Sequence, residues 1–212
     1  MATVPFTDWL PFVLPHAVGV PDLLATKSIQ SACIDFCNQT NWWQGTLGPI
    51  TLSTANVPYT FVPPTGATVA QIMSAIYKGI PLAHTNIDEL TNKVLNWRDH
   101  TGDPRAVFQE QPGIASLYPA PAVGGSYDVT FRVSYAPLRA STTIDQQVFE
   151  AFQDEIAAGA LGILFAMPQK PWTDMDMAKA YSAAFTNAKV LGAIQASRSY
   201  GRQGQQIQMR AF

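Results

Sequence analysis

Apolar residues recur at helical spacing along the last third of the chain. From residue 144 to residue 163 most apolar positions are three or four residues apart, and the same spacing returns after residue 173. The first set is Ile144, Val148, Phe149, Phe152, Ile156, Ala160 and Ile163, and the second is Met177, Tyr181, Ala184, Phe185, Ala188 and Leu191. Pro168 and Pro171 stop the first helix, because proline lacks the amide hydrogen. The stretch Thr143–Ser199 therefore predicts two long antiparallel helices joined by the linker Met167–Thr173.

Capping residues set the expected ends of these two helices. Thr143 and Gln146 have the spacing of a capping box, in which each side chain binds a free amide of the first turn. Thr173 is expected to cap the second helix, since Asp174 and Asp176 follow it in the turn where the macrodipole favours anions. Both helices should thus begin at a threonine.

The chain before the hairpin divides into three patterns. Residues 1–20 are apolar, aromatic and proline-rich without a period, which predicts an extended arm on its own domain or on a neighbour. Residues 21–40 carry a helical apolar stripe. From Gly48 to Pro137 the period shifts towards two, most clearly in Tyr127–Tyr135. The other candidate strands are Ile50–Ser53, Val57–Val62, Thr68–Tyr77 (equally readable as a helix), Val107–Gln109 and Ile114–Tyr118, and a short helix is expected at Asn86–Trp97.

Together these patterns predict an α+β fold. It would be a helical bundle built on the long C-terminal antiparallel helix hairpin, with an inserted small antiparallel β module and extended terminal arms. The expected units are an N-terminal extended arm (1–20), the first helix of the bundle (21–47), the β module with a short helix (48–137), the helical hairpin (138–199) and a C-terminal tail (200–212). The tail alternates only weakly, and it either adds as a strand to a partner or is disordered.

Charged residues are scarce. They make up 13% of the 212 residues, about half the usual share, which favours a surface that is covered by assembly. The net charge of −2 gives no general attraction to nucleic acid or to an anionic membrane. The longest apolar run, Ile156–Met167, is too short to cross a bilayer, and no signal-peptide pattern opens the chain. A cytoplasmic product with no membrane partner is expected.

The few charges of the hairpin are sorted by sign. From Thr143 to Met167 every charge is acidic, whereas after Asp176 every charge is basic. Antiparallel pairing would bring Glu150 near the level of Lys189, in the same subunit or in the next. These charges are either ordinary solvated pairs, worth about 0–1 kcal/mol each, or the contact between copies in a ring. The candidates for a subunit interface are Asp145, Glu150, Asp154, Lys189 and Arg198.

Residues that carry chemistry are scattered. The sequence contains no nucleophile elbow, phosphate loop, dinucleotide fingerprint or zinc signature. His100 beside Asp99 and Asp103 is the one cluster that could suggest a site, and a solvated turn explains it as well. Cys33 and Cys37 are expected to be buried free thiols, and the Trp42-Trp43 pair is expected to pack in the core. No catalytic, cofactor-binding or metal-binding residue is therefore assigned, and no enzyme activity is expected.

Three pieces of the hairpin carry a resemblance. They are Ile156-Ala157-Ala158-Gly159-Ala160-Leu161, then Met167-Pro168-Gln169-Lys170-Pro171-Trp172, and then the spaced Ala178, Phe185 and Ala188. Together they resemble a pattern in the head-to-tail adaptor (connector) proteins of bacteriophages, best matched in those of short-tailed phages. Pro137 after the Tyr127–Tyr135 strand and Pro21-Asp22 before the upstream helix also fit that pattern. The tail from Tyr200 onwards departs from it.

The resemblance implies a virion structural protein of the neck between capsid and tail. Such adaptors form a closed ring of about twelve copies in which two different faces of each subunit meet. The partners implied are further copies of the chain, the portal protein, a tail nozzle or tail tube protein, and double-stranded DNA that passes through the channel without sequence-specific binding. Assembly would take place in the host cytoplasm.

The terminal segments are the expected contacts with portal, tail or neighbouring copies. The contact candidates are Phe6, Trp9, Phe12, Arg202, Ile207, Met209, Arg210 and Phe212. Two other hypotheses remain open at this stage. One is a different phage tail or completion protein, and the other is a small enzyme or ligand-binding protein with its site near His100.

Overall fold

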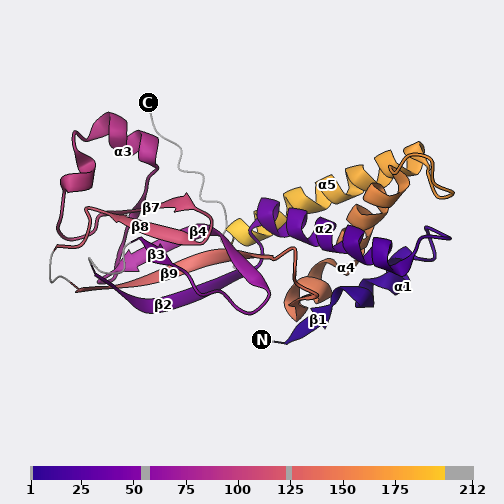
Figure 1. Cartoon of the computed structure of the whole chain (residues 1–212), viewed down its shortest axis with the longest axis horizontal. Coiled ribbons are helices and arrows are strands. Elements are labelled where there is room, and N and C mark those ends of the chain that lie inside the picture. The colour runs from indigo at the N-terminus through magenta and orange to yellow at the C-terminus, as the bar shows by residue number, and fades with distance from the viewer. Residues whose placement is uncertain (1, 54–57, 123–125, 199–212) are drawn as a thin grey trace, which may run out of the picture.

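The protein is elongated, with helices gathered at one end and strands at the other (Figure 1). The structure, a computed structural model, describes residues 2–53, 58–122 and 126–198. The helical end contains α1 (Leu10–Val13), α2 (Asp22–Thr40), α4 (Gln146–Phe165) and α5 (Met175–Ser197), together with the short 3₁₀ turn η1 (Phe6–Trp9). At the far end of the strands lie α3 (Ile87–Lys93) and the 3₁₀ turn η2 (Trp97–Asp99).

Two four-stranded sheets and one two-stranded sheet make up the β structure. The first has the order β2 (Gln44–Ser53), β9 (Ser126–Pro137), β4 (Ala67–Tyr77) and β5 (Ile80–Pro81), with every pair antiparallel. The second has the order β3 (Tyr59–Thr60), β8 (Ile114–Tyr118), β7 (Ala106–Gln111) and β6 (Ala83–His84), and its β6–β7 pair is parallel. The third pairs β1 (Thr3–Pro5) with β10 (Thr143–Asp145).

Strand β9 connects the two ends of the molecule. It pairs with β2 on one side and with β4 on the other, so it lies at the centre of its sheet. Its alternating Tyr127, Val129, Phe131, Val133 and Tyr135 are all buried, as period two requires of a strand with one face on a core. The ring of Phe131 lies 5.1 Å from that of Phe61, which follows β3. The two four-stranded sheets thus share one hydrophobic core, and helix α2 packs on β9 at the helical end.

The predicted fold class is wrong. The protein is not a helical bundle with a small β insertion, because the described residues form five α-helices and ten strands in three sheets. The prediction underestimated β2, which begins at Gln44 rather than at Ile50. Gly45, Gly48 and Pro49 hide its alternation in the sequence, yet the strand continues through them with a bulge between Leu47 and Ile50. Gly45 is needed there because a Cβ would lie 2.6 Å from the Tyr135 ring.

The extended N-terminal arm is also a wrong prediction. Residues 3–13 form a short strand and two helical turns, and the side chains of Phe6, Trp9 and Val13 are fully buried in the same chain. Their spacing has no obvious period because the segment changes from strand to 3₁₀ to α-helix within eleven residues. The proposed C-terminal arm lies outside the described residues.

The two hairpin helices begin later than the threonines suggested. Thr143 belongs to β10, and Asp145 caps α4 by accepting a hydrogen bond from the amide of Gln147 at 2.9 Å. Asp174 caps α5 by accepting from two amides of its first turn, at 3.1 and 3.0 Å. Thr173 instead donates its hydroxyl to the carbonyl of Met167, inside the linker. Aspartate and threonine are both favoured at the cap position of a helix. At the start of α4 the cap is Asp145, because Thr143 is held in the β10 strand that pairs with β1.

Candidate assembly surfaces

Helix α5 packs on α4 and α2 through small residues. A Cβ on Gly159 of α4 would lie 2.9 Å from three carbons of the Phe185 ring, and one on Gly192 of α5 would lie 3.0 Å from Phe36 of α2. Small residues at these positions let the three helices approach closely. The buried side of α5 consists of Ala178, Phe185, Ala188, Gly192 and Ala196.

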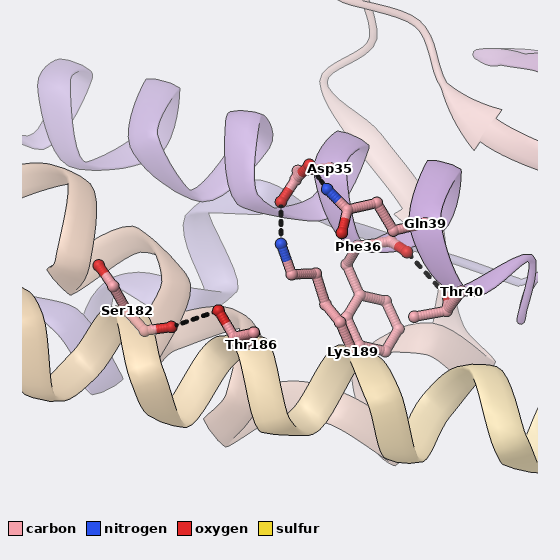
Figure 2. A network of polar contacts seen from close by, with 7 residues as sticks. All are labelled: Asp35, Phe36, Gln39, Thr40, Ser182, Thr186 and Lys189. Atoms are coloured by element: carbon pink, nitrogen blue, oxygen red, sulfur yellow. Dashed lines mark hydrogen bonds and ion pairs between the residues drawn. The ribbon is translucent and has the colours of Figure 1, made fainter.

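One ion pair joins α5 to α2. The ammonium of Lys189 lies 2.8 Å from a carboxylate oxygen of Asp35, whose other oxygen accepts from the side-chain amide of Gln39 at 2.7 Å (Figure 2). The same ammonium sits 4.8 Å from the centre of the Phe185 ring. Only 15% of the Lys189 side chain is exposed, so this predicted interface residue is already paired inside the subunit.

Removing this pair should have a measurable effect on stability. We expect Lys189→Ala to lower the free energy of unfolding by about 1–2 kcal/mol, because a charge-assisted hydrogen bond and the packing of the lysine stem on Phe185 are both lost. The matched control is Lys179→Ala on the same helix, whose ion pair with Asp176 is 3.8 Å long and highly exposed. That change should alter stability by less than about 0.5 kcal/mol. Urea unfolding followed by circular dichroism measures both, and equal effects would contradict the assignment.

The opposite side of α5 is exposed, and it carries no charge from Ala180 to Ile194, the part of the helix that follows the exposed Asp176 and Lys179. We call this surface the α5 outer face; it comprises Ala180, Ala183, Ala184, Asn187, Val190, Leu191 and Ile194, all exposed. Val190 and Leu191 expose 56% and 61% of their surface. A helix face in contact with water normally carries charged and polar residues. The α5 outer face therefore has the composition of a contact surface.

The predicted acidic residues of α4 fall into two groups. Asp145 is 5% exposed and serves as the cap, so its side chain is not at the surface. Glu150 and Asp154 are exposed, and neither forms an ion pair within the described part of the chain. Glu150 accepts a hydrogen bond from the side chain of Gln146 at 2.5 Å. The exposed acids of α4 are thus available to a cation from outside the subunit.

The remaining predicted contact residues are divided by burial. Phe6 and Trp9 are buried, so they stabilise the subunit itself, whereas Phe12 is 37% exposed. Arg198 is exposed directly after α5. The other predicted contacts lie outside the described residues; they are Arg202, Ile207, Met209, Arg210 and Phe212.

The hypothesis of a site near His100 finds little geometric support. The Nδ1 atom of His100 lies 3.0 Å from the Tyr118 hydroxyl, and Asp103 accepts a long hydrogen bond of 3.4 Å from Tyr77. Within residues 2–53, 58–122 and 126–198, no group of three or more His, Cys, Asp or Glu side chains could hold a metal ion.

No described helix has the length and apolar character needed to cross a membrane.

The two cysteines lie on α2 as buried free thiols. Burial raises the pKa of the Cys37 thiol to about 12, and burial together with the neighbouring Cys37 raises the pKa of Cys33 well above its usual value. Both thiols stay protonated at neutral pH, so neither is a reactive nucleophile. They act as small core residues.

Sequence reasoning missed two polar residues of α2 that hold the structure together. Gln30 is 6% exposed, and its side-chain amide donates to the carbonyls of Arg139 and Ser141 at 3.0 and 2.7 Å. It thereby fixes α2 to the segment between β9 and β10. Asp35 is the partner of Lys189 described above. The sequence feature that could have indicated the burial of Gln30 is its position next to Ile29, at the edge of the apolar stripe of the helix.

Comparison with known proteins identifies a family. The family model described as SU10 adaptor protein matches residues 15–208. The matched range includes α2, α3, α4 and α5 and both four-stranded sheets. No sequence among the curated proteins matches the chain.

Proposed function

This chain belongs to the SU10 adaptor protein family, a family of structural adaptors of bacteriophage virions, and from this membership we propose that it is a head-to-tail adaptor. Its copies form a closed ring of about twelve subunits beneath the portal, in which two different faces of each subunit meet. The ring joins the capsid to a tail nozzle or tail tube protein. Double-stranded DNA passes through it without sequence-specific binding.

The observation that carries this proposal is the α5 outer face. A subunit that works alone would have to keep Val190, Leu191 and Ile194 in water, although a surface helix normally presents charged groups there. In a ring the same face is covered by the next copy. The exposed Glu150 and Asp154 of α4 supply a second, chemically different face, and Arg198 is a cation that such a face can pair with. Two unlike faces are what a heterologous ring requires.

The portal and tail contacts are proposed at the ends of the chain. Phe12 is the exposed aromatic of the N-terminal segment. The segment after α5 contributes Arg202, Ile207, Met209, Arg210 and Phe212. The neck of the virion is the proposed location, reached by assembly in the host cytoplasm. Short-tailed phages are the proposed source, since the hairpin motifs resemble their adaptors most closely.

A charge placed on the α5 outer face should prevent ring formation. We expect Leu191→Arg to leave the monomer folded, because the side chain is 61% exposed, and to reduce ring assembly on purified portal at least about tenfold. An arginine there puts an unpaired charge into the subunit contact. The mass of the portal complex, measured by analytical ultracentrifugation, gives the number of bound copies.

The matched control is Leu95→Arg, at a position 86% exposed shortly after α3 (Ile87–Lys93), a helix that lies beyond the strands and away from α5 (Figure 1). It should assemble like the unchanged protein. If Leu191→Arg gave the same copy number as this control, the α5 outer face would not be the subunit interface. If the unchanged protein never joined a portal as a ring, the adaptor proposal itself would be wrong.

A further inference from the structure

A hollow lies where the helical end of the protein meets its sheets. It has a volume of about 340 Å³, and Trp43 and Asp145 form part of its wall. Its other lining residues are Thr3, Pro64, Thr65, Thr143 and Ile144. Strands β1 and β10, which supply Thr3 and Asp145, lie at the helical end, whereas Trp43 precedes β2 and Pro64 precedes β4 (Figure 1). Ligand pockets usually measure about 300–1,000 Å³, so this hollow suits a small group such as one side chain.

One carboxylate oxygen of Asp145 has no partner inside the subunit. The residue is 5% exposed, and its Oδ1 atom accepts the hydrogen bond from the amide of Gln147 that caps α4. Within the described part of the chain, the other oxygen has no hydrogen-bond donor, and Asp145 forms no ion pair. A buried carboxylate is normally paired with a cation as well as hydrogen-bonded, because its charge is costly to remove from water. The wall of the hollow therefore offers an anion to a cation from outside.

The rest of the wall fits a guanidinium group. The hydroxyls of Thr3, Thr65 and Thr143 have no hydrogen-bond partner among residues 2–53, 58–122 and 126–198, so each can accept an N–H. The indole of Trp43 is 6% exposed and packs edge-on against the Tyr135 ring, with centroids 5.5 Å apart. A guanidinium carries five donors in one plane and is attracted to an indole face, whereas an ammonium is a compact, strongly hydrated charge. Arginine therefore suits this combination of groups better than lysine.

Arg198 is a guanidinium without an acidic partner in its own subunit. It is exposed directly after α5, and it forms no ion pair within the described part of the chain. Its backbone is still in the right-handed helical region, and it comes four residues after Ile194. Residues four apart lie on the same side of a helix, so Arg198 continues the α5 outer face. That face thus ends in a free cation.

We propose that the hollow beside Asp145 is a binding site for a guanidinium group, and that in the ring it receives Arg198 of the next copy. This occupant rests on the proposed function, which places the α5 outer face against a neighbouring subunit. Charge complementarity favours it, because a buried anion that lacks a cation meets an exposed cation that lacks an anion. The apolar part of the α5 outer face supplies contact area, whereas the pair of Arg198 and Asp145 fixes the register of the two subunits.

Titration of the free subunit with ethylguanidinium tests the pocket without the ring. NMR of the labelled full chain follows the indole N–H of Trp43 and the amide of Gln147, which donates to the same carboxylate. Ethylguanidinium should shift both signals until they saturate, whereas neutral ethylurea, which has nearly the same shape, should give no saturating shift. Asp145→Asn should raise the Kd for ethylguanidinium at least about fivefold, because the charge-assisted contact is lost. Asparagine caps a helix as well as aspartate does, so α4 stays intact.

Asp88→Asn is the matched control for this titration. It removes the same charge from an exposed position in the first turn of α3. The affinity for ethylguanidinium should stay as it is in the unchanged protein. Equal shifts with ethylguanidinium and ethylurea, or equal affinities of Asp145→Asn and Asp88→Asn, would overturn the pocket.

Ring assembly on purified portal tests the occupant. Asp145→Asn and Arg198→Gln should each lower the association constant at least about tenfold, because each leaves one charge of a desolvated pair without its partner. The double variant should assemble no worse than either single variant, since it leaves no unpaired charge. Analytical ultracentrifugation at several protein concentrations gives the number of bound copies.

Failure of the occupant and failure of the ring give different results. A ring that forms equally well with Arg198→Gln would exclude Arg198 as the occupant and leave the adaptor proposal intact. Losses that add up in the double variant would contradict a direct pair of Arg198 and Asp145. A chain that never forms a ring would refute the proposed function and the occupant together, and the ethylguanidinium titration would still decide for or against the pocket.

Discussion

Replacing Trp9 with alanine should lower the free energy of unfolding by about 3–5 kcal/mol, because the change removes a fully buried indole and leaves a large cavity. Trp9 is 0% exposed. Its ring packs edge-on against Phe149 of α4, with centroids 4.5 Å apart. Its Nε1 donates to the carbonyl of Gln153 at 3.1 Å, so the substitution also leaves that carbonyl without this donor. The N-terminal segment thus acts as a clamp on the first half of α4.

The hydrogen bond from Trp9 to Gln153 lies next to an irregularity in α4, so Trp9→Ala should loosen α4 in particular as well as destabilise the whole protein. Phe152, beside Gln153, has φ −138° and ψ 30°, which interrupts the helical geometry of α4. The indole of Trp9 therefore binds α4 directly at its kink. We expect amide exchange in the first turns of α4 to rise more than exchange in β9 when Trp9 is replaced, because the hydrogen bond of the indole and its edge-on contact with Phe149 are both made to α4.

Phe12→Ala is the matched control for the clamp. Phe12 lies one turn away on α1 and is 37% exposed, so its loss should change stability by less than about 1 kcal/mol. Chemical denaturation of both variants measures the difference. A Trp9→Ala protein as stable as Phe12→Ala would show that Trp9 does not hold the N-terminal segment on α4, contrary to the packing seen in the structure.

Replacing Gly159 with leucine should cost about 3 kcal/mol, since the side chain must enter space that the Phe185 ring occupies. A Cβ alone would lie 2.9 Å from three ring carbons, closer than packed atoms approach. The ring belongs to the buried side of α5 and is held between α4 and α2, at 6.3 Å from the Phe36 ring. It cannot move without separating α5 from its neighbours.

The reason for this effect can be tested with a double substitution. Phe185→Ala makes room, so Gly159→Leu should be much less destabilising in that background than alone, with a coupling energy of about 1–3 kcal/mol. Ala151→Leu, at an exposed position of the same helix, should change stability by less than about 0.5 kcal/mol. Additive effects of the two core substitutions would mean that Gly159 is needed for another reason. If α5 moved away from α4, the α5 outer face would move with it. Gly159→Leu should therefore weaken ring assembly as well.

Patterns within single segments were enough to locate several elements. Tyr127–Tyr135 alternates in sequence, and its five alternating apolar residues are all buried in β9, because successive side chains of a strand point to opposite faces whatever the strand pairs with. The helix after Pro21 and the two helices after residue 143 were also predicted correctly from the sequence. Their apolar spacing and their flanking prolines are local signals that do not depend on distant parts of the chain. The scarcity of charge and the hairpin motifs pointed to an assembly protein, and the family match agrees with a phage adaptor.

Other features were decided only by the tertiary structure. Lys189 and Asp35 are 154 residues apart, and no local pattern could pair them or remove Lys189 from the list of surface charges. Trp9 is core and not a free arm because α4, far along the chain, supplies its pocket. The order β2-β9-β4-β5 places β2 at an edge of its sheet among the described residues, and no pattern within Gln44–Ser53 indicates that position. Local residues determine which backbone conformation a segment adopts, whereas burial, ion pairing and edge position depend on which distant segments meet it.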